Sequence, residues 1–414
     1  MEEPLSADPI RDRLRGLACN PALPAETLLR LADDERVGPE YVTARRTWTD
    51  EAFDALAAHP CPAVREALAQ SPGATGEQRA RLVGDLDLDV LHALLEGPPA
   101  RWSGPLPDWV HRRLAEHPER RVRDLLTFIP GTPRDVLTKL SRDPHPGIAE
   151  AARELLARRP AQQTTMGRDQ AVAYASGDSD WNRARAAADP ELPDDWVKRL
   201  TADPSPHVRL AVSVRPGLSE EQRAEADYPV RPVPDVPVPA WVVAAGPGEL
   251  RDCARSAHYL LRRGAACHPE LPTDLITSLA ADDDPGVRLM LCAHQAGAPA
   301  DLLLRTYLEA PGDLAAELLA HPAFPSAGLA RFAGHPSARA RALARLDPGA
   351  PAGLIERLSH DPDPAVRAFL ADDPRLPPAR IAELLHDPGI HGRAAANPGL
   401  PHAEMSRILT EAGL

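Results

Sequence analysis

The sequence lacks the short motifs that mark most enzyme active sites. It contains no glycine-rich phosphate loop, no G-x-S-x-G nucleophile turn and no H-E-x-x-H zinc helix. Carboxylates are abundant, with 60 Asp and Glu in 414 residues, but they recur at a regular spacing instead of forming one distinctive acid–base pair. These absences predict a chain that binds a partner, with neither catalytic residues nor a cofactor.

Aromatic residues and lysine are scarce. Aromatics make up 4% of the chain while hydrophobic residues total 43%, so Ala, Leu and Val must build the core. Such a core suits thin layers of closely packed helices. Lysine occurs only at Lys139 and Lys198, and arginine supplies the remaining positive charge, a bias that GC-rich codon usage explains.

Long hydrophobic runs and a cysteine framework are missing too. No run approaches the eighteen apolar residues of a membrane span, and no N-terminal segment resembles a signal peptide. Five scattered cysteines do not predict a disulfide scaffold, so we expect a cytoplasmic protein. A net charge of −13 disfavours nucleic acid as the partner, because binding to phosphates relies on cationic side chains.

A repeat of 24–26 residues fills most of the chain. Its clearest copy begins at Asp361-Pro362, continues through Val366-Arg367 and reaches Pro374 and Pro377; a second copy follows 24 residues later. A fixed period of this size indicates a stack of small supersecondary units. The pair of prolines three residues apart recurs at Pro21/Pro24, Pro130/Pro133, Pro190/Pro193, Pro269/Pro272, Pro322/Pro325, Pro348/Pro351, Pro374/Pro377 and Pro398/Pro401.

Each part of the repeat has a physical role in forming two short helices. An Asp, His or Ser before proline suits the start of a first helix, and Pro374 ends that helix because proline lacks an N–H. Pro377 then begins a second helix, whose apolar face is Ile381, Leu384 and Leu385. Such short helices are stable only when stacked. The sequence therefore predicts an all-α fold, an α-solenoid of two-helix repeats.

The phrase V-R-x-x-L-A-x-x-P-x-L-P-x-x-x-I-x-x-L-x-x-D-P, which runs from Val366 to Pro388, resembles the leucine-rich repeat variant family, a relative of HEAT repeats. The resemblance implies a right-handed superhelix in which an α-helix alternates with a second, often 3₁₀, helix. A founding member carries an N-terminal cysteine cluster that holds an iron–sulfur centre. This N-terminus offers only Cys19 and Cys61, so no such cofactor is expected.

Two stretches interrupt the period and suggest how the chain is organised. Gln162 to Asp180 is polar and predicts a degenerate repeat or an exposed loop, while Tyr228 to Trp241 is proline-rich and must be extended. The extended segment could be a spacer, or a ligand for a proline-recognising partner. We therefore expect N-terminal repeats with a cap, an irregular segment, more repeats, a proline-rich connection and C-terminal repeats, at 1–160, 161–184, 185–227, 228–250 and 251–414.

In several repeats an arginine directly follows the Val that recurs in the first helix. Stacking would align these arginines in a column, which could bind phosphate or an acidic peptide. Alternatively, each arginine could pair with the Asp that begins a helix of its own or the adjoining repeat, a role that suits the two-bond geometry of the guanidinium group. The members of the column are Arg65, Arg123, Arg209, Arg288 and Arg367.

Histidine, cysteine and tryptophan offer weaker candidate sites. Cys253, His258, Cys267, His268, Cys292 and His294 cluster in sequence, but no C-x₂-C knuckle is present, so no metal site is expected. Each His-Pro pair replaces an Asp-Pro at a turn, where capping is the favoured role over pH sensing. Trp109, Trp196 and Trp241 could form an aromatic ridge or pack between repeats.

The sequence thus favours a non-catalytic scaffold that binds a protein or peptide. The residues proposed to bind are the five arginines of the column together with Pro232, Pro234, Pro237 and Trp241. Two alternatives stay open at this point. One is a nucleic-acid-binding or DNA-glycosylase-like HEAT solenoid, and the other is a regulatory subunit of an enzyme encoded nearby.

Overall fold

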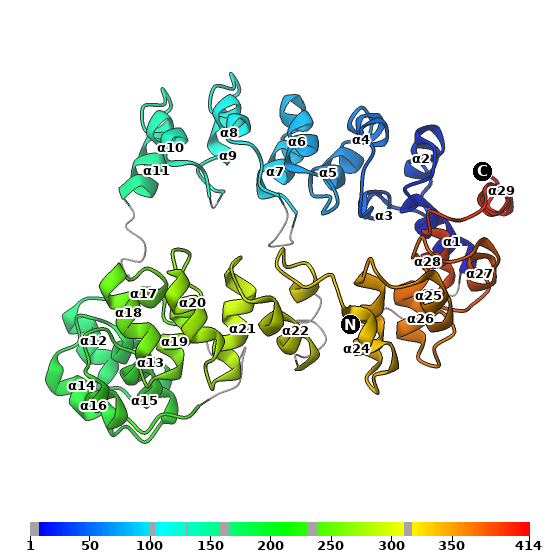
Figure 1. Ribbon diagram of the computed structural model, residues 1–414. Coiled ribbons are helices and arrows are strands. Elements are labelled where there is room, and N and C mark those ends of the chain that lie inside the picture. The colour runs from blue at the N-terminus through cyan, green and yellow to red at the C-terminus, as the bar shows by residue number, and fades with distance from the viewer. Residues whose placement is uncertain (1–7, 99–103, 130, 158–165, 231–237, 310–316) are drawn as a thin grey trace. The chain divides into compact units, whose positions relative to one another are not determined.

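The computed structural model describes residues 8–98, 104–129, 131–157, 166–230, 238–309 and 317–414. All regular structure in these ranges is helical, which confirms the expected all-α fold (Figure 1). The chain divides into two compact units: unit 1 is Met1–Ala157 with Ser326–Leu414, and unit 2 is Arg158–Pro325. No described helix combines the length and apolar character that crossing a membrane requires.

Unit 1 is built from two stretches of the chain, each a series of short helices. Its N-terminal stretch contains α1 (Pro9–Ala18), α2 (Ala25–Ala32), α3 (Pro39–Thr43), α4 (Asp50–Ala57), α5 (Pro62–Ala69), α6 (Gly76–Arg79), η1 (Ala80–Gly84), α7 (Leu88–Glu96), α8 (Asp108–Leu114), α9 (Arg120–Leu125), α10 (Arg134–Leu140) and α11 (Pro146–Ala157). Its C-terminal stretch contains η2 (Leu329–Gly334), α24 (Ala338–Ala342), η3 (Leu343–Leu346), α25 (Ala352–Leu358), α26 (Pro364–Leu370), α27 (Pro378–Leu384), α28 (His391–Ala395) and α29 (His402–Glu411).

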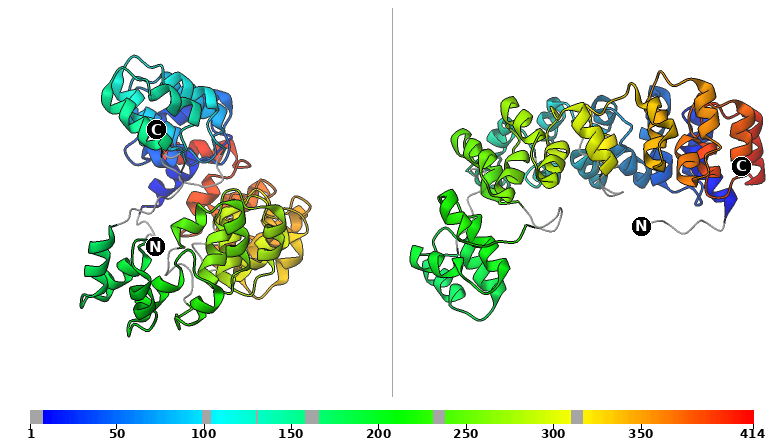
Figure 2. Two further views of the ribbon diagram at one scale, coloured as in Figure 1. Left: turned by 90° about the vertical axis from the view of Figure 1, so that its left-hand side faces the viewer. Right: turned by 60° about the horizontal axis from the view of Figure 1, so that its bottom comes forward.

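Unit 2 is a second series of the same kind. It contains α12 (Arg168–Ala175), α13 (Asp180–Ala188), α14 (Asp194–Thr201), α15 (Pro206–Ser213), α16 (Glu220–Ala224), α17 (Ala240–Val243), α18 (Pro247–Arg255), α19 (Tyr259–Ala266), α20 (Thr273–Ala280), α21 (Pro285–His294) and α22 (Ala300–Glu309). Helix α12 lies within the polar stretch 162–180, so that stretch holds a helix of a repeat and not only a loop. Figure 2 shows the helices of each unit from two further sides.

The prolines begin and end the helices as the sequence predicts. In the repeat at Asp361, Pro364 is the first residue of α26, and the Asp363 side chain accepts a hydrogen bond from Ala365 N at 2.9 Å. Pro377 precedes α27, and Ile381 and Leu384 of that helix and the following Leu385 are at most 1% exposed. The apolar faces of both helices are therefore buried between repeats, as short helices require.

The turn before each first helix also repeats. Asp361 Oδ1 accepts a hydrogen bond from the backbone N–H two residues on, and a histidine does the same through Nδ1 where it replaces the aspartate. The histidines of this kind are His59, His117 and His335, with bonds of 3.1 Å, and His321 makes the same bond, of 3.0 Å, in the turn before a second helix. The His-Pro pairs thus act as local turn-forming residues.

A buried polar side chain at the end of the first helix ties many repeats to the one before. Asn397 Nδ2 donates to the backbone oxygens of Ala371 and Asp373, both at 2.8 Å. Gln295 and Arg215 make the equivalent pair of bonds in unit 2. These side chains satisfy carbonyl groups that the helix ends would otherwise leave buried and unpaired.

The two ends of the chain meet inside unit 1 as if they were consecutive repeats. Asn20 Nδ2 donates to the backbone oxygens of Ala395 and Asn397, at 3.0 and 2.6 Å, and so repeats the bonding of Asn397 itself. Helix α1 packs directly against α28, and one continuous hydrophobic core runs through both stretches of unit 1 (Figure 1).

This terminal junction, defined here as the α1–α28 contact, is unusually close. A Cβ atom placed on Gly16 would lie 1.8 Å from the backbone oxygen of Gly392, so a residue with a side chain cannot fit there. His391 Nε2 lies 3.1 Å from an Asp12 carboxylate oxygen, and Arg13 pairs with Glu411 at 3.3 Å. The first repeat therefore completes the array that the last repeat leaves open.

Candidate binding surface

Six arginines form a ladder in which every one makes the same set of bonds. Nη1 donates to the two carbonyl oxygens six and five residues earlier, while Nε bonds the carboxylate of the aspartate twenty residues later. In the Arg65–Asp85 pair the two carboxylate bonds, from Nε and Nη2, are 2.7 and 3.0 Å. The pairs of this arginine ladder are Arg65–Asp85, Arg123–Asp143, Arg183–Asp203, Arg262–Asp282, Arg341–Asp361 and Arg367–Asp387.

Most of the ladder is shielded from water. The side chains of Arg123 and Asp143 are 13% and 4% exposed, and only the Arg367–Asp387 pair exceeds 20% for both partners. The hydrogen bond from Arg123 holds the pKa of Asp143 below its usual value, and Arg341 lowers the pKa of Asp361 in the same way. These arginines are therefore bound within the chain, as the structural alternative for the column requires.

Breaking a shielded pair should destabilise the protein. Replacing Arg123 by alanine leaves the Asp143 carboxylate buried without its partner, so we expect the free energy of unfolding to fall by about 3 kcal/mol. Arg81→Ala is the matched control, because Arg81 and its partners Asp50 and Asp54 are all more than one-third exposed; its loss should cost under about 1 kcal/mol. Urea denaturation followed by circular dichroism measures both, and equal costs would contradict a structural ladder.

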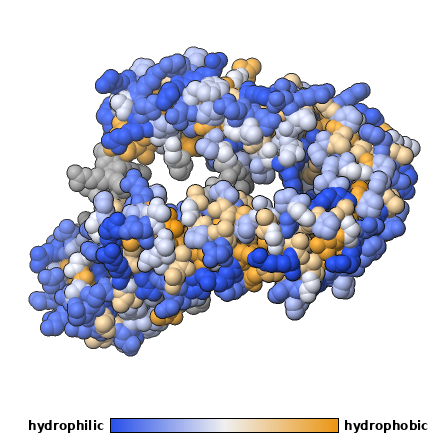
Figure 3. Space-filling view, viewed as in Figure 1, coloured by the Kyte–Doolittle hydropathy of each residue, from blue (hydrophilic) through white to orange (hydrophobic). Residues whose placement is uncertain are grey.

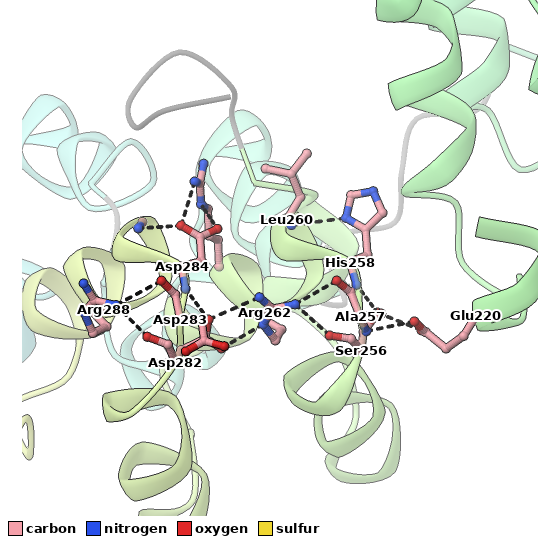
Figure 4. Close-up of polar contacts among 12 residues, drawn as sticks. Glu220, Ser256, Ala257, His258, Leu260, Arg262, Asp282, Asp283, Asp284 and Arg288 are labelled. Carbon is pink, nitrogen blue, oxygen red and sulfur yellow. Dashed lines mark hydrogen bonds and ion pairs between the residues drawn. The ribbon is translucent and has the colours of Figure 1, made fainter. Parts of the chain in front are cut away.

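Two arginines of the predicted column depart from the ladder. Arg209 Nε donates to the backbone oxygen of Asp227 at 3.0 Å, while the Asp227 carboxylate lies 3.8 Å from Nη2 and its side chain is 96% exposed. Within the described part of the chain, Arg288 makes the two Nη1 bonds, to the backbone oxygens of Asp282 and Asp283, and no ion pair (Figure 4). The structure thus separates these two arginines from Arg65, Arg123 and Arg367.

Three arginines of the ladder were not among the sequence candidates. Arg183, Arg262 and Arg341 follow Asn182, Leu261 and Ala340, so a search for Val-Arg or Ile-Arg does not find them. The signal that identifies them is an aspartate twenty residues downstream, which all three possess.

The proline-rich segment is fastened to unit 2 at both ends. Tyr228 stacks on His258 with ring centroids 4.1 Å apart, and the Tyr259 hydroxyl donates to the backbone oxygen of Pro229 at 3.2 Å. At the other end, Trp241 Nε1 donates to the backbone oxygen of Val214 at 2.9 Å. Pro232, Pro234 and Pro237 lie outside the described residues. Trp241 is half-buried, and its indole nitrogen is used within the chain.

Five of the six histidines and cysteines of 253–294 are buried in unit 2, and His294 is half-buried. His258 is 1% exposed and its Nε2 lies 2.9 Å from Ser213 Oγ; burial lowers its pKa to about 3. Burial also raises the pKa of Cys253 to about 12 and that of Cys292 to about 11, so both remain thiols at neutral pH. Across the described residues, no three His, Cys, Asp or Glu side chains are arranged to hold a metal ion.

A few large hydrophobic side chains are exposed. In unit 1 these are Leu86, Phe128 and Trp109, which are 98%, 72% and 44% exposed. In unit 2, Trp181 is 64% exposed and stacks on His207 at 5.9 Å, and Val230 beside the proline-rich segment is 71% exposed. On the face that Figure 3 shows, hydrophobic residues gather over α21 and α22, while α8 to α11 are mainly hydrophilic. Exposed hydrophobic side chains are therefore present in both units.

Comparison with known proteins adds little to this geometry. No family model matches the chain, and no curated protein matches it. A crystal structure described as that of an engineered protein is 13% identical and covers 97% of this chain and 96% of its own, with a TM-score of 0.13. A TM-score this low supports no inference about fold or function, so the resemblance to the leucine-rich repeat variant family stays a prediction.

Proposed function

We propose that the protein is a non-catalytic scaffold whose two units are α-solenoids that bind a protein or peptide partner. The observation that carries this proposal is the repeated bonding from one repeat to the next. The arginine ladder and the buried side chains such as Asn397 and Gln295 recur at equivalent positions. Arrays of this kind present long surfaces, and their stability is roughly a sum over repeats and their interfaces.

The binding residues are best sought where the repeat is irregular. The regular polar positions already serve the ladder, the turns and the carbonyl groups of the preceding repeat. By contrast, Val230 is 71% exposed at the start of a segment that is anchored through Tyr228 and Trp241. A proline-rich segment held at both ends loses little entropy when a partner binds it.

Replacing the prolines of 229–239 with Gly and Ser at equal length should abolish capture of the partner. A tagged full-length chain expressed in its native host, followed by mass spectrometry of the captured proteins, measures this. Helicity and melting temperature should stay near those of the wild type, because the anchoring contacts of Tyr228 and Trp241 are retained.

Two outcomes would point elsewhere. Capture that survives this change but is lost on Trp109→Ala would move the binding surface to the regular repeats. A purified chain that carries nucleic acid, seen as a raised ratio of absorbance at 260 nm to that at 280 nm, would favour the nucleic-acid-binding alternative.

A further inference from the structure

At the terminal junction, two neighbouring repeats of unit 1 are far apart in the chain. Elsewhere a short turn joins one helix to the next, as 371–377 joins α26 to α27. By contrast, the Asn20 side chain bonds the backbone oxygen of Ala395, 375 positions away. Consecutive repeats separate only if their connecting turn unfolds, whereas α1 and α28 separate without the unfolding of any helix. The terminal junction therefore resembles an interface between two separate chains.

The junction has the contacts of a complete interface between repeats. Helix α1 packs against both α28 and α29, and a continuous hydrophobic core crosses from one stretch of unit 1 to the other (Figure 1). Polar contacts add to it: Arg36 Nη2 donates to the backbone oxygen of Ala412 at 2.9 Å, and Arg46 pairs with Asp372 at 3.4 Å. Both complementary faces belong to one chain, so a second copy of the protein presents a matching α1 and a matching α28.

The arginine ladder is weaker where it crosses the junction. His391 lies one repeat after Arg367, at the position of a ladder arginine. Arg367 donates three hydrogen bonds, one to the Asp387 carboxylate and two to backbone oxygens. His391 makes two contacts, 3.1 Å to the Asp12 carboxylate and 3.3 Å to the backbone oxygen of Asp387. The imidazole therefore holds α1 with fewer bonds than a guanidinium group would, which makes the junction easier to open.

We propose that two copies of the protein exchange this contact, so that α1 of each copy packs against α28 of the other. Exchange of identical elements is a low-cost route to a dimer. Two closed monomers and one exchanged dimer contain the same number of α1–α28 contacts. Protein concentration therefore decides between them, and the dimer fraction should rise with it. The exchange concerns assembly and is independent of the proposed capture of a partner.

Charge reversal of the pair Arg13–Glu411, 3.3 Å apart across the junction, tests the exchange in the full-length chain. Arg13→Glu alone, or Glu411→Arg alone, places like charges together both in the monomer and in its own dimer. In a mixture of the two variants, the exchanged dimer has an opposite-charge pair at both of its junctions. The Kd of this heterodimer should be at least about tenfold below that of the wild-type dimer, because two pairs change from repulsion to attraction. Light scattering and native mass spectrometry of differently tagged copies measure it.

The matched control is the pair Arg112–Asp135, 2.9 Å apart, which joins α8 to α10 in consecutive repeats of unit 1. A mixture of Arg112→Asp and Asp135→Arg should form no more dimer than the wild type, because consecutive repeats cannot exchange this contact without unfolding.

Two results would overturn the proposal. A mixture of Arg13→Glu and Glu411→Arg that stays monomeric at every concentration would confine the contact to one chain. As much heterodimer in the control mixture would place the dimer interface elsewhere. If Arg13→Glu is unfolded on its own, circular dichroism should show its helicity return on refolding with Glu411→Arg, and helicity that does not return would also count against the exchange.

Discussion

Replacing Gly16 by alanine should strongly lower the free energy of unfolding of unit 1. The new Cβ would lie 1.8 Å from the backbone oxygen of Gly392, and a backbone atom cannot move aside as a flexible side chain can. Overpacking of this kind costs about 3 kcal/mol at the upper end of its usual range. For a unit of this size that corresponds to a fall in melting temperature of roughly 6–12 °C, measured by circular dichroism.

The matched control is Gly353→Ala in α25 of the same unit. No atom lies within 4 Å of a Cβ atom built on Gly353, and alanine favours a helix over glycine by about 1 kcal/mol, so this variant should be neutral or more stable. If Gly16→Ala were as stable as Gly353→Ala, helices α1 and α28 would not be in close contact in solution.

Mild acid should destabilise unit 2 through His258. Its pKa of about 3 in the folded chain lies well below the value of about 6.5 in the unfolded chain, because burial disfavours the charged imidazole. The unfolded chain therefore binds more protons between these two values, and the free energy of unfolding falls as the pH falls through that window. Each pH unit below about 6.5 removes up to about 1.4 kcal/mol.

Melting temperatures between pH 7 and 4.5 measure this effect, and most carboxylates are still ionised over that range. Changing His258 to glutamine should flatten the pH dependence, whereas changing the exposed His360 should leave it as in the wild type. A wild-type melting temperature that stays constant down to pH 4.5 would show that His258 is not buried as the structure places it.

The repeat is predictable from sequence because its signals are local. A proline fixes where each helix begins or ends, and the apolar spacing of Val366, Leu370 and Ile381 fixes which face is buried. The pairing of arginine with aspartate was one of two alternatives that the sequence left open. Choosing between them required knowing that position i+20 lies beside position i in the next repeat.

The terminal junction was not predictable in this way. Asn20 and Ala395 are 375 positions apart, and no periodic pattern states that the last repeat precedes the first in space. The sequence does contain one sign of the junction, because Asn20-Pro21 and Asn397-Pro398 are the same residues at the same place in the repeat.

The meeting of the chain ends has a consequence for synthesis on the ribosome. The face of α1 that receives α28 is made long before its partner, because Asn20 and Ala395 are 375 positions apart, so that face stays uncovered until α28 has been translated. The entropy lost on closing so long a loop grows only slowly with its length, so the delay costs little stability at equilibrium. A premature stop before Ile390 would therefore harm the amino-terminal repeats, although every one of their residues is present.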